Sequence, residues 1–446
     1  MLRVAPAASL KERVVERTAK PAVRWGVSHG LPRLVINRAA RQGDLQGRMI
    51  ATAMSEPYVD QLQPLFDELR EHGPLVRGRL SFVTASHAAV KEVLGSNDFG
   101  TGLPLPADGP VARLGRWSAS DVFNPVSPPS LLVTDPPDHT RYRKLVTRVF
   151  SVRAVERMRE RTQQVADELL DALDPDRPVD LVTAYCGLLP VTVISEILGV
   201  PTGMRQRILE LGAAAGASLD LGVSWRQFRA VEAALREFDD WLTGHIEMLR
   251  RHPGDNLLSH LIEAQEDGVG LTERELKATA GLVLAAGFET TVNLLGNGIA
   301  LLRRHPDQLA ALLGDPSGWP NAVEEILRFD PPVLLTGRIA LRDTEVAGTR
   351  VPAGIPVTTV LAGANRDRDV FADPDIFDIT RPNARDHISF SSGRHHCLGA
   401  QLARMEGEVG LRSLFERFPD LRLEDGAARR QTRILRGYEH LPASLR

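Results

Sequence analysis

The sequence contains few cysteines and few aromatic residues. Only Cys186 and Cys397 occur among its 446 residues, and aromatic residues make up 5% of the chain. Two cysteines cannot build the disulfide framework of a secreted scaffold, so we expect a reducing compartment, the cytoplasm, and ask of each thiol what chemistry it performs. The formal net charge is −3, which provides no general signal for nucleic-acid binding.

The sequence also lacks a convincing membrane span. Residues 278–302 are long enough to cross a bilayer and carry a single charge, Glu289. Glycines, asparagines and threonines interrupt this stretch, and exposing the polar groups to lipid would be costly. We therefore predict no transmembrane segment and expect a long helix buried in the centre of the protein.

The first fifty residues differ in charge from the rest of the chain. They contain ten Lys or Arg and three Asp or Glu, a local balance of +7. No continuous apolar core follows the basic start, which argues against a secretory signal. We predict a basic, loosely ordered arm over residues 1–50 and one domain over residues 51–446. Weak attachment of the arm to an anionic membrane surface is the alternative.

Helical patterns dominate the remainder. Apolar residues recur every three or four positions in 151–173 and 224–251, and Thr272 with Glu275 forms a capping box that opens a helix reaching about residue 305. Residues 338–367 alternate and contain Gly and Pro, which indicates a small antiparallel sheet. There is no β-α-β alternation and no Gly-rich dinucleotide fingerprint. The expected fold class is mainly α (α+β), a helical single domain with small antiparallel sheets.

The stretch "FSSGRHHCLG", residues 390–399, contains the strongest chemical signal. A zinc site would require several separated ligands, whereas His395, His396 and Cys397 are consecutive. A cysteine-protease signature is absent, and a merely buried cysteine in a turn is the structural alternative. Gly393 and Gly399 let the backbone approach a flat group closely, and the helix that follows would lower the pKa of the Cys397 thiol.

This stretch resembles the haem-binding signature F-x-x-G-x-H-x-C-x-G of the cytochrome P-450 family, soluble bacterial type. The resemblance implies a haem-thiolate protein in which Cys397 alone binds the iron of haem b and His395 reaches a propionate, whereas His396 packs or lies at the surface. Ser391 departs from the glycine usual in bacterial members. The matching residues are Phe390, Gly393, His395, Cys397 and Gly399.

Three distant motifs support the resemblance. Ala286 begins "AGFETT", in which Glu289 and Thr290 match the family's catalytic proton-delivery pair; helix packing is the structural alternative. Glu325 and Arg328 lie one helical turn apart, which alone indicates an ordinary surface ion pair. The resemblance instead makes them a structural network with Arg381 that supports the cysteine loop.

The third motif, "TDPPDHTRYRKLV", predicts a helix from about Asp138 with His139 and Arg143 on one face. A solvated basic face is the structural alternative. Because buried propionates need cations, the resemblance implies that His139, Arg143, Arg338 and His395 bind them.

The function implied is a monooxygenase that inserts one atom of dioxygen into a hydrophobic small molecule, such as a lipid, terpenoid, steroid or polyketide. Electrons would come from NAD(P)H through ferredoxin reductase and ferredoxin, which would dock near Arg141, Lys144 and Arg148. A peroxide-using peroxygenase or decarboxylase and a non-catalytic haem sensor are the alternatives. The expected pocket walls are residues 99–123, 209–223, 282–286 and 333–337, and the turn around Tyr438.

Overall fold

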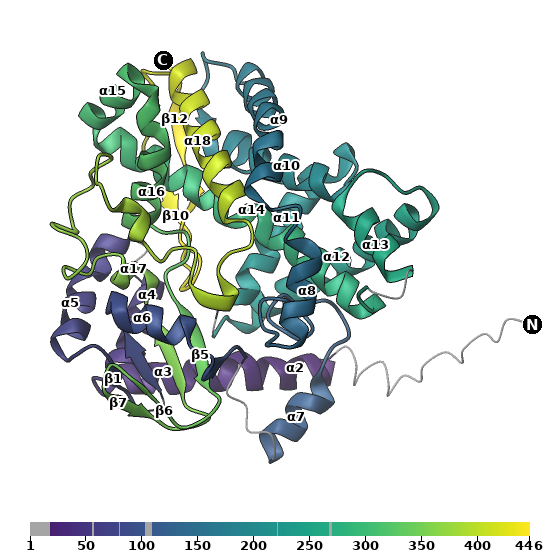
Figure 1. The fold of residues 1–446 in the computed structure, drawn as a ribbon, viewed down its shortest axis with the longest axis vertical. Coiled ribbons are helices and arrows are strands. Elements are labelled where there is room, and N and C mark those ends of the chain that lie inside the picture. The colour runs from purple at the N-terminus through teal and green to yellow at the C-terminus, as the bar shows by residue number, and fades with distance from the viewer. Residues whose placement is uncertain (1–17, 56–57, 80, 103–108, 221, 267–269) are drawn as a thin grey trace, which may run out of the picture.

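The computed structural model describes residues 18–446 except 56–57, 80, 103–108, 221 and 267–269. Helices form most of it and surround a central helix, α14; some of the small sheets lie at the lower left, and C-terminal strands lie higher up beside the helices (Figure 1). The larger helices are α5 (Gln63–Glu71), α6 (His87–Gly95), α7 (Pro110–Ser118), α8 (Asp138–Val146), α9 (Val152–Asp171), α10 (Leu188–Leu198), α11 (Arg205–Gly216), α12 (Trp225–Arg251), α13 (Leu257–Glu266), α14 (Glu273–Arg304), α15 (Pro306–Gly314), α16 (Trp319–Phe329) and α18 (Ala400–Arg417).

Helix α14 is the axis of the core. Thr272 caps its N-terminus by accepting the N–H of Glu275, as the capping box predicted. The helix packs against α10, α11, α16 and α18, which explains why its sequence is apolar on every side. Among the described helices it alone is long and apolar enough to cross a membrane, and 83% of its most apolar stretch is buried inside the protein.

The main sheet has five strands in the order β1-β2-β8-β5-β3, with bounds β1 (Val76–Arg77), β2 (Phe82–Thr84), β3 (Phe99–Gly100), β5 (Thr336–Ala340) and β8 (Pro356–Thr359). The antiparallel pair β5–β8 and the hairpin of β6 (Thr344–Val346) with β7 (Thr349–Val351) confirm the sheet predicted over 338–367. One pairing, β2–β8, is parallel and brings in strands that the sequence pattern did not reveal. Smaller sheets contain β4 (Val179–Asp180), β9 (Arg422–Leu423), β10 (Ala428–Arg429), β11 (Tyr438–His440) and β12 (Pro442–Ser444).

Within the first fifty residues, the described part is helical from residue 18 onward except for a turn at 42–44. Helices α2 (Lys20–Trp25), η2 (Gly26–Gly30) and α3 (Leu31–Arg41) run on continuously, and α4 (Leu45–Ser55) follows. Met49 is fully buried and Ala39 nearly so, because α3 and α4 pack against each other. This packing differs from the loose arm that we expected; residues 1–17 lie outside the described residues, and the boundary at residue 50 stays a prediction.

Candidate active site

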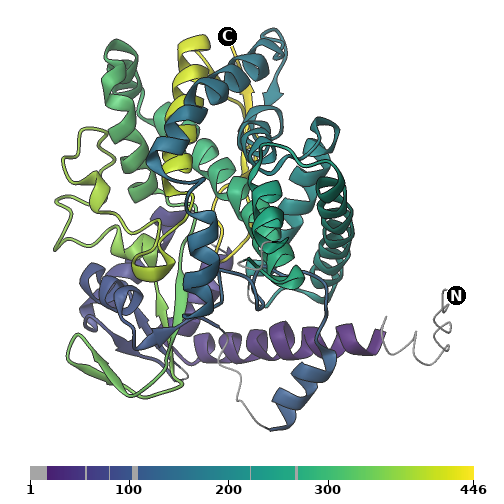
Figure 2. The same ribbon diagram turned by 45° about the vertical axis from the view of Figure 1, so that its right-hand side comes forward.

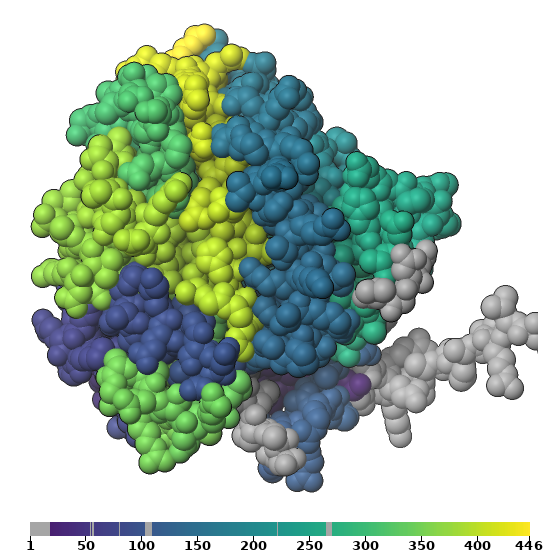
Figure 3. Space-filling view, in the orientation of Figure 1, coloured from purple at the N-terminus to yellow at the C-terminus, as the bar shows by residue number. Residues whose placement is uncertain are grey.

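A cavity of about 1100 Å³ separates α14 from the loop that precedes α18. The loop brings Phe390, His395, Cys397 and Gly399 to its wall, and α14 contributes Ala286, Gly287 and Thr290. Other segments far apart in the chain also meet: α18 lies against α9, as the space-filling view shows (Figure 3). The sequence motifs around residues 286–291 and 390–399 therefore face one common space.

The cysteine loop has a constrained backbone. The N–H of Cys397 donates to the carbonyl of Phe390 at 2.8 Å, and Gly393 has a φ of +66°. A Cβ on Gly393 would lie 2.3 Å from the carbonyl oxygen of Leu94, so only glycine fits here. Ser391 has a φ of +62°, a conformation that costs non-glycine residues energy, and this explains why the family pattern has glycine at this position.

Cys397 lies three residues before α18, as predicted, and its side chain is accessible from the cavity. The expected lowering of its thiol pKa is not found: burial by the surrounding protein raises that pKa, and the opposing effects of the Gly399 N–H and the charges of Arg143 and Arg404 are smaller. The other thiol, Cys186, is fully buried in the core. Cys397 is therefore the cysteine placed to bind a group held in the cavity.

Four cationic or ionisable side chains gather along the same wall: His139, Arg143, Arg338 and His395. The His139 and His395 rings lie 4.3 Å apart, and Nη2 of Arg143 donates to the carbonyl of His396 at 2.8 Å. Burial lowers the pKa of Arg338 to about 10. Burial, followed by the charges of Arg338 and His139, lowers the pKa of His395 to about 4.

This cluster contains more cationic groups than acids. Asp135 is the nearby carboxylate, with Oδ1 at 3.5 Å from Nε2 of His395 and 3.9 Å from Nη1 of Arg394. Nε2 of both His139 and His395 is buried and has no hydrogen-bond partner within the described part of the chain. A dianionic group would satisfy these donors and relieve the repulsion, so the residues present fit the two propionates of a haem.

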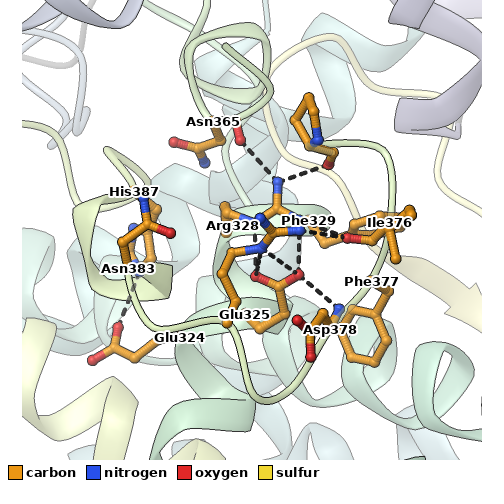
Figure 4. A network of polar contacts seen from close by, with 12 residues as sticks. Glu324, Glu325, Arg328, Phe329, Asn365, Ile376, Phe377, Asp378, Asn383 and His387 are labelled. Atoms are coloured by element: carbon orange, nitrogen blue, oxygen red, sulfur yellow. Dashed lines mark hydrogen bonds and ion pairs between the residues drawn. The ribbon is translucent and has the colours of Figure 1, made fainter. Parts of the chain in front are cut away.

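The predicted structural network is buried beside the loop (Figure 4). Arg328 donates through Nε and Nη2 to Glu325 at 2.6 and 2.7 Å, and both side chains are fully buried. Nε of Arg381 reaches Glu325 at 3.3 Å. Arg328 and Arg381 also donate to the carbonyls of Ile376 and its neighbours, so the network ties α16 to the chain that leads into the cysteine loop.

A second acidic network, which sequence reasoning missed, supports the loop directly. Glu324 accepts hydrogen bonds from His387 at 3.0 Å and from Arg404 at 2.9 Å. The N–H of Ser389 donates to Nδ1 of His387 at 3.1 Å, so Nε2 carries the proton given to Glu324. The guanidinium of Arg404 lies over the Phe390 ring at 4.6 Å from its centre. Figure 4 shows Glu324 and His387 next to the Glu325 network.

Glu289 and Thr290 occupy different surroundings. Thr290 lines the cavity, whereas Glu289 is buried and forms an ion pair with Arg430. Burial raises the pKa of Glu289, and Arg430 opposes this shift. Gly287 lies so close to α10 that an added Cβ would be 2.6 Å from the Ile194 side chain. The helix packing that we considered as the structural alternative therefore applies to this glycine. In this conformation, Glu289 itself does not line the cavity.

Two more residues of the site escaped the sequence analysis. Arg430 approaches Glu289 from 141 positions away, and no local pattern announces such a contact. Glu406 lines the cavity from α18, and burial raises the pKa of its carboxyl well above the ordinary value. Its signal was present in the sequence: it lies four residues after Leu402 and three before Val409, on the buried face of the helix.

The predicted walls agree in part with the cavity. Each of these predicted segments contributes some lining residues: Gly115 and 118–123, 217–220 and Val223, Leu282, Val283 and Ala286, and Val333 and 335–337. Residues 103–108 lie outside the described part of the chain. At the C-terminal turn, Ile434 and Leu435 line the cavity, whereas Tyr438 packs against Arg429, whose guanidinium lies 4.5 Å from the ring centre. Within the docking patch expected on α8, Arg141 is paired with Glu275 at 2.7 Å, and Lys144 and Arg148 are exposed.

The comparisons with known proteins agree with this geometry. A family model described as Cytochrome P450 matches residues 218–313 and 320–429. The protein named cytochrome P450 140 in Mycobacterium tuberculosis is 50% identical over 438 residues, which cover 96% of this chain and 98% of the relative. The 6-deoxyerythronolide B hydroxylase of Saccharopolyspora erythraea is 44% identical over 316 residues, covering 70% of this chain and 77% of the relative.

Solved structures give the same result. The ligand-free structure of Mycobacterium smegmatis CYP164A2 superposes with a TM-score of 0.78 at 33% identity and covers 89% of this chain and 99% of its own. The tirandamycin C-bound monooxygenase TamI superposes with a TM-score of 0.76 at 35% identity, covering 86% of this chain and 97% of its own.

Proposed function

Since the chain belongs to the cytochrome P450 family, an oxidoreductase family of haem-thiolate monooxygenases, we propose that it oxygenates a large hydrophobic molecule of the polyketide or steroid type. The observation that carries the proposal is the accessible Cys397 thiol in a cavity that Thr290 also lines. The wall of the same cavity contains the cluster described above, in which cationic groups outnumber acids. Relatives named 6-deoxyerythronolide B hydroxylase and vitamin D(3) 25-hydroxylase support this substrate class, and so does the volume of about 1100 Å³.

In this proposal the cofactor is haem b, and each side chain has a definite task. Cys397 would bind the iron through its thiolate, and His139, Arg143, Arg338 and His395 would neutralise the propionates. When bound, thiolate-ligated haem activates dioxygen for cleavage of its O–O bond. Thr290 holds a proton at its hydroxyl toward the cavity, and Glu289 resupplies protons when its carboxyl leaves Arg430.

The electron donor in the proposal is a ferredoxin, reduced by its reductase from NAD(P)H in the cytoplasm. Lys144 is exposed on α8, the helix that extends Arg143 to the cysteine loop, and Arg148 is exposed in the turn that follows it. An acidic ferredoxin bound at this position would lie on the same side of the active site as the Cys397 loop. Arg141 contributes less charge, because Glu275 already pairs with it.

The cysteine assignment is tested by Cys397→Ser beside the matched control Cys186→Ser. We expect the first variant to lose the thiolate-type absorbance band of carbon monoxide-bound ferrous haem, and the second to keep it. Persistence of that band in the Cys397 variant would contradict the site.

The monooxygenase assignment is tested by Thr290→Ala beside Thr290→Ser, which keeps a hydroxyl. We expect the alanine variant to consume reduced cofactor while releasing hydrogen peroxide in place of product, and the serine variant to stay coupled. Equal product yield per electron in both variants would remove the case for proton delivery by Thr290. Efficient turnover with peroxide alone would favour the peroxide-using alternative.

A further inference from the structure

Exposed apolar side chains gather on one side of the molecule. Among the described residues nine large hydrophobic side chains are exposed, and five of these belong to α3, α7 and the start of α12: Leu31 at 51%, Leu34 at 71%, Leu114 at 46%, Trp117 at 45% and Trp225 at 38%. The helices are neighbours, because α2, which continues into α3, contacts both α7 and α12. Figure 2 shows α2 and α3 as one long rod along the lower edge, with α7 below it.

The same segments are basic throughout. Residues 18–43, 109–120 and 224–231 contain no Asp or Glu and nine lysines or arginines: Lys20, Arg24, Arg33, Arg38, Arg41, Arg113, Arg116, Arg226 and Arg229. Of these, Arg33, Arg38, Arg41, Arg113, Arg116, Arg226 and Arg229 are exposed. Leucine and tryptophan beside arginine is the composition of helices that lie in a membrane interface and contact anionic lipid. We call these three segments the basic apolar surface.

The surface is held together as one unit. The indole N–H of Trp25 donates to the carbonyl of Val223 at 3.0 Å, and the Trp25 and Trp225 rings pack edge to face at 5.8 Å. Arg24 forms a 3.2 Å ion pair with Glu232, which fastens α2 to α12. A preformed surface of this kind can bind without ordering a segment first.

The basic apolar surface also adjoins the active-site cavity. Val27, Ser28, His29 and Ile36, from the rod that carries Leu31 and Leu34, line the cavity on their inner side. The rod is therefore the wall between the cavity and the solvent at this end of the molecule. A hydrophobic substrate dissolved in lipid would meet the protein at this wall.

We propose that the basic apolar surface binds peripherally to an anionic lipid membrane. Five exposed leucine and tryptophan side chains favour lipid over an acidic protein partner, since charge complementarity alone would need only the arginines. Lipid binding is independent of the proposed reaction. The delivery of substrate from the membrane into the cavity rests on the proposed function.

The binding is tested by co-sedimentation of the full-length holoprotein with vesicles of phosphatidylcholine alone or mixed with phosphatidylglycerol. We expect binding only to the mixed vesicles, and weakening by salt. Arg33→Gln with Arg38→Gln should weaken binding about fivefold for each arginine. The matched control, Arg153→Gln with Arg157→Gln, changes two exposed arginines of α9 and should bind like the wild type.

The apolar contribution is tested in the same assay. Leu31→Ser with Leu34→Ser should reduce binding, whereas Leu341→Ser with Ile376→Ser, which changes equally exposed residues elsewhere, should not. Brominated lipid should quench the fluorescence of Trp117 and leave the fully buried Trp319 unquenched, so Trp117→Phe should remove much of the quenching.

Three results would overturn the proposal. They are no binding to anionic vesicles, equal effects of the variants in the basic apolar surface and of their control variants, and quenching that Trp117→Phe does not change. Binding of an acidic acyl carrier protein that Arg33→Gln with Arg38→Gln abolishes, without vesicle binding, would assign the surface to a protein partner. The carbon monoxide spectrum and product yield of each variant, measured without vesicles, report separately on the proposed function.

Discussion

Replacing Glu325 by alanine would test the structural network most directly. Glu325 is the only acid that Arg328 contacts within the described residues, and both side chains are 0% exposed. The variant keeps the bonds from Arg328 to the carbonyls of Asn365 and Pro374, at 3.0 and 2.8 Å, but leaves its charge buried without a counter-ion. Arg381 loses the same partner.

Removing one member of a buried pair costs about 3–5 kcal/mol. A free energy of unfolding is commonly about 5–15 kcal/mol, so the variant should lose a large part of its stability. Because the network supports the chain leading into the cysteine loop, haem retention should fall as well. The measurement is urea unfolding of the haem-free and haem-loaded proteins, followed by circular dichroism and haem absorbance.

Two controls separate charge from general fragility. Glu325→Gln keeps the shape and some hydrogen bonds, and should fall between wild type and the alanine variant. Arg342→Ala removes the partner of Asp98 at a site where the arginine is 69% exposed, and should cost less than about 1 kcal/mol. If Glu325→Ala unfolded within about 1 kcal/mol of the wild type, the network would not be what holds the loop.

Three further changes have defined outcomes. Gly393→Ala should destabilise the protein, because the new Cβ would meet Leu94. The Cβ of Gly399→Ala would have no protein atom beyond its chain neighbours within 4 Å, so this variant should keep the stability of the haem-free protein but bind less haem. Ser391→Gly, which relieves a φ of +62°, should raise the free energy of unfolding by up to about 1 kcal/mol in urea titrations, and a loss of stability would contradict the strain. Burial raises the pKa of Glu324, but hydrogen bonds from His387 and Arg404 outweigh it and lower that pKa from 4.5 to about 2. A lowered pKa stabilises above pH 4.5 and the gain is lost as the pH falls toward 2, so the wild type should lose about 3 kcal/mol over this window and Glu324→Gln should not.

Local patterns determined much of the secondary structure. The capping box at Thr272 predicted the start of α14, and the apolar period over 224–251 predicted α12; both helices are formed. The strands β1, β2 and β3 are two or three residues long, and β2 and β3 pair with β8 and β5 from far along the chain. Such short strands have no detectable period, so only their pairing identifies them.

The N-terminal segment shows how packing overrides composition. Its basic charge suggested a loose arm, and charge does oppose a buried core. Yet Ala39, Leu45 and Met49 bury their side chains between α3, α4 and the rest of the domain. A minority of apolar residues on one face is enough to fix a helix, and a count of charges does not reveal which face they occupy.

The sequence by itself places Cys397 and the glycines beside it within ten consecutive residues, and the resemblance of this stretch to the family's signature predicted the haem-thiolate chemistry. It also predicted the central buried helix, because an apolar run of that length with polar groups in it is stable only when it is buried inside the protein. Only the tertiary structure decided that Glu289 pairs with Arg430 and that Glu406 lines the cavity. It also decided that the three segments of the basic apolar surface lie together beside one end of that cavity. These contacts join residues from distant parts of the chain. The partner of a buried charge depends on which helices pack together, and a local sequence pattern does not contain that information.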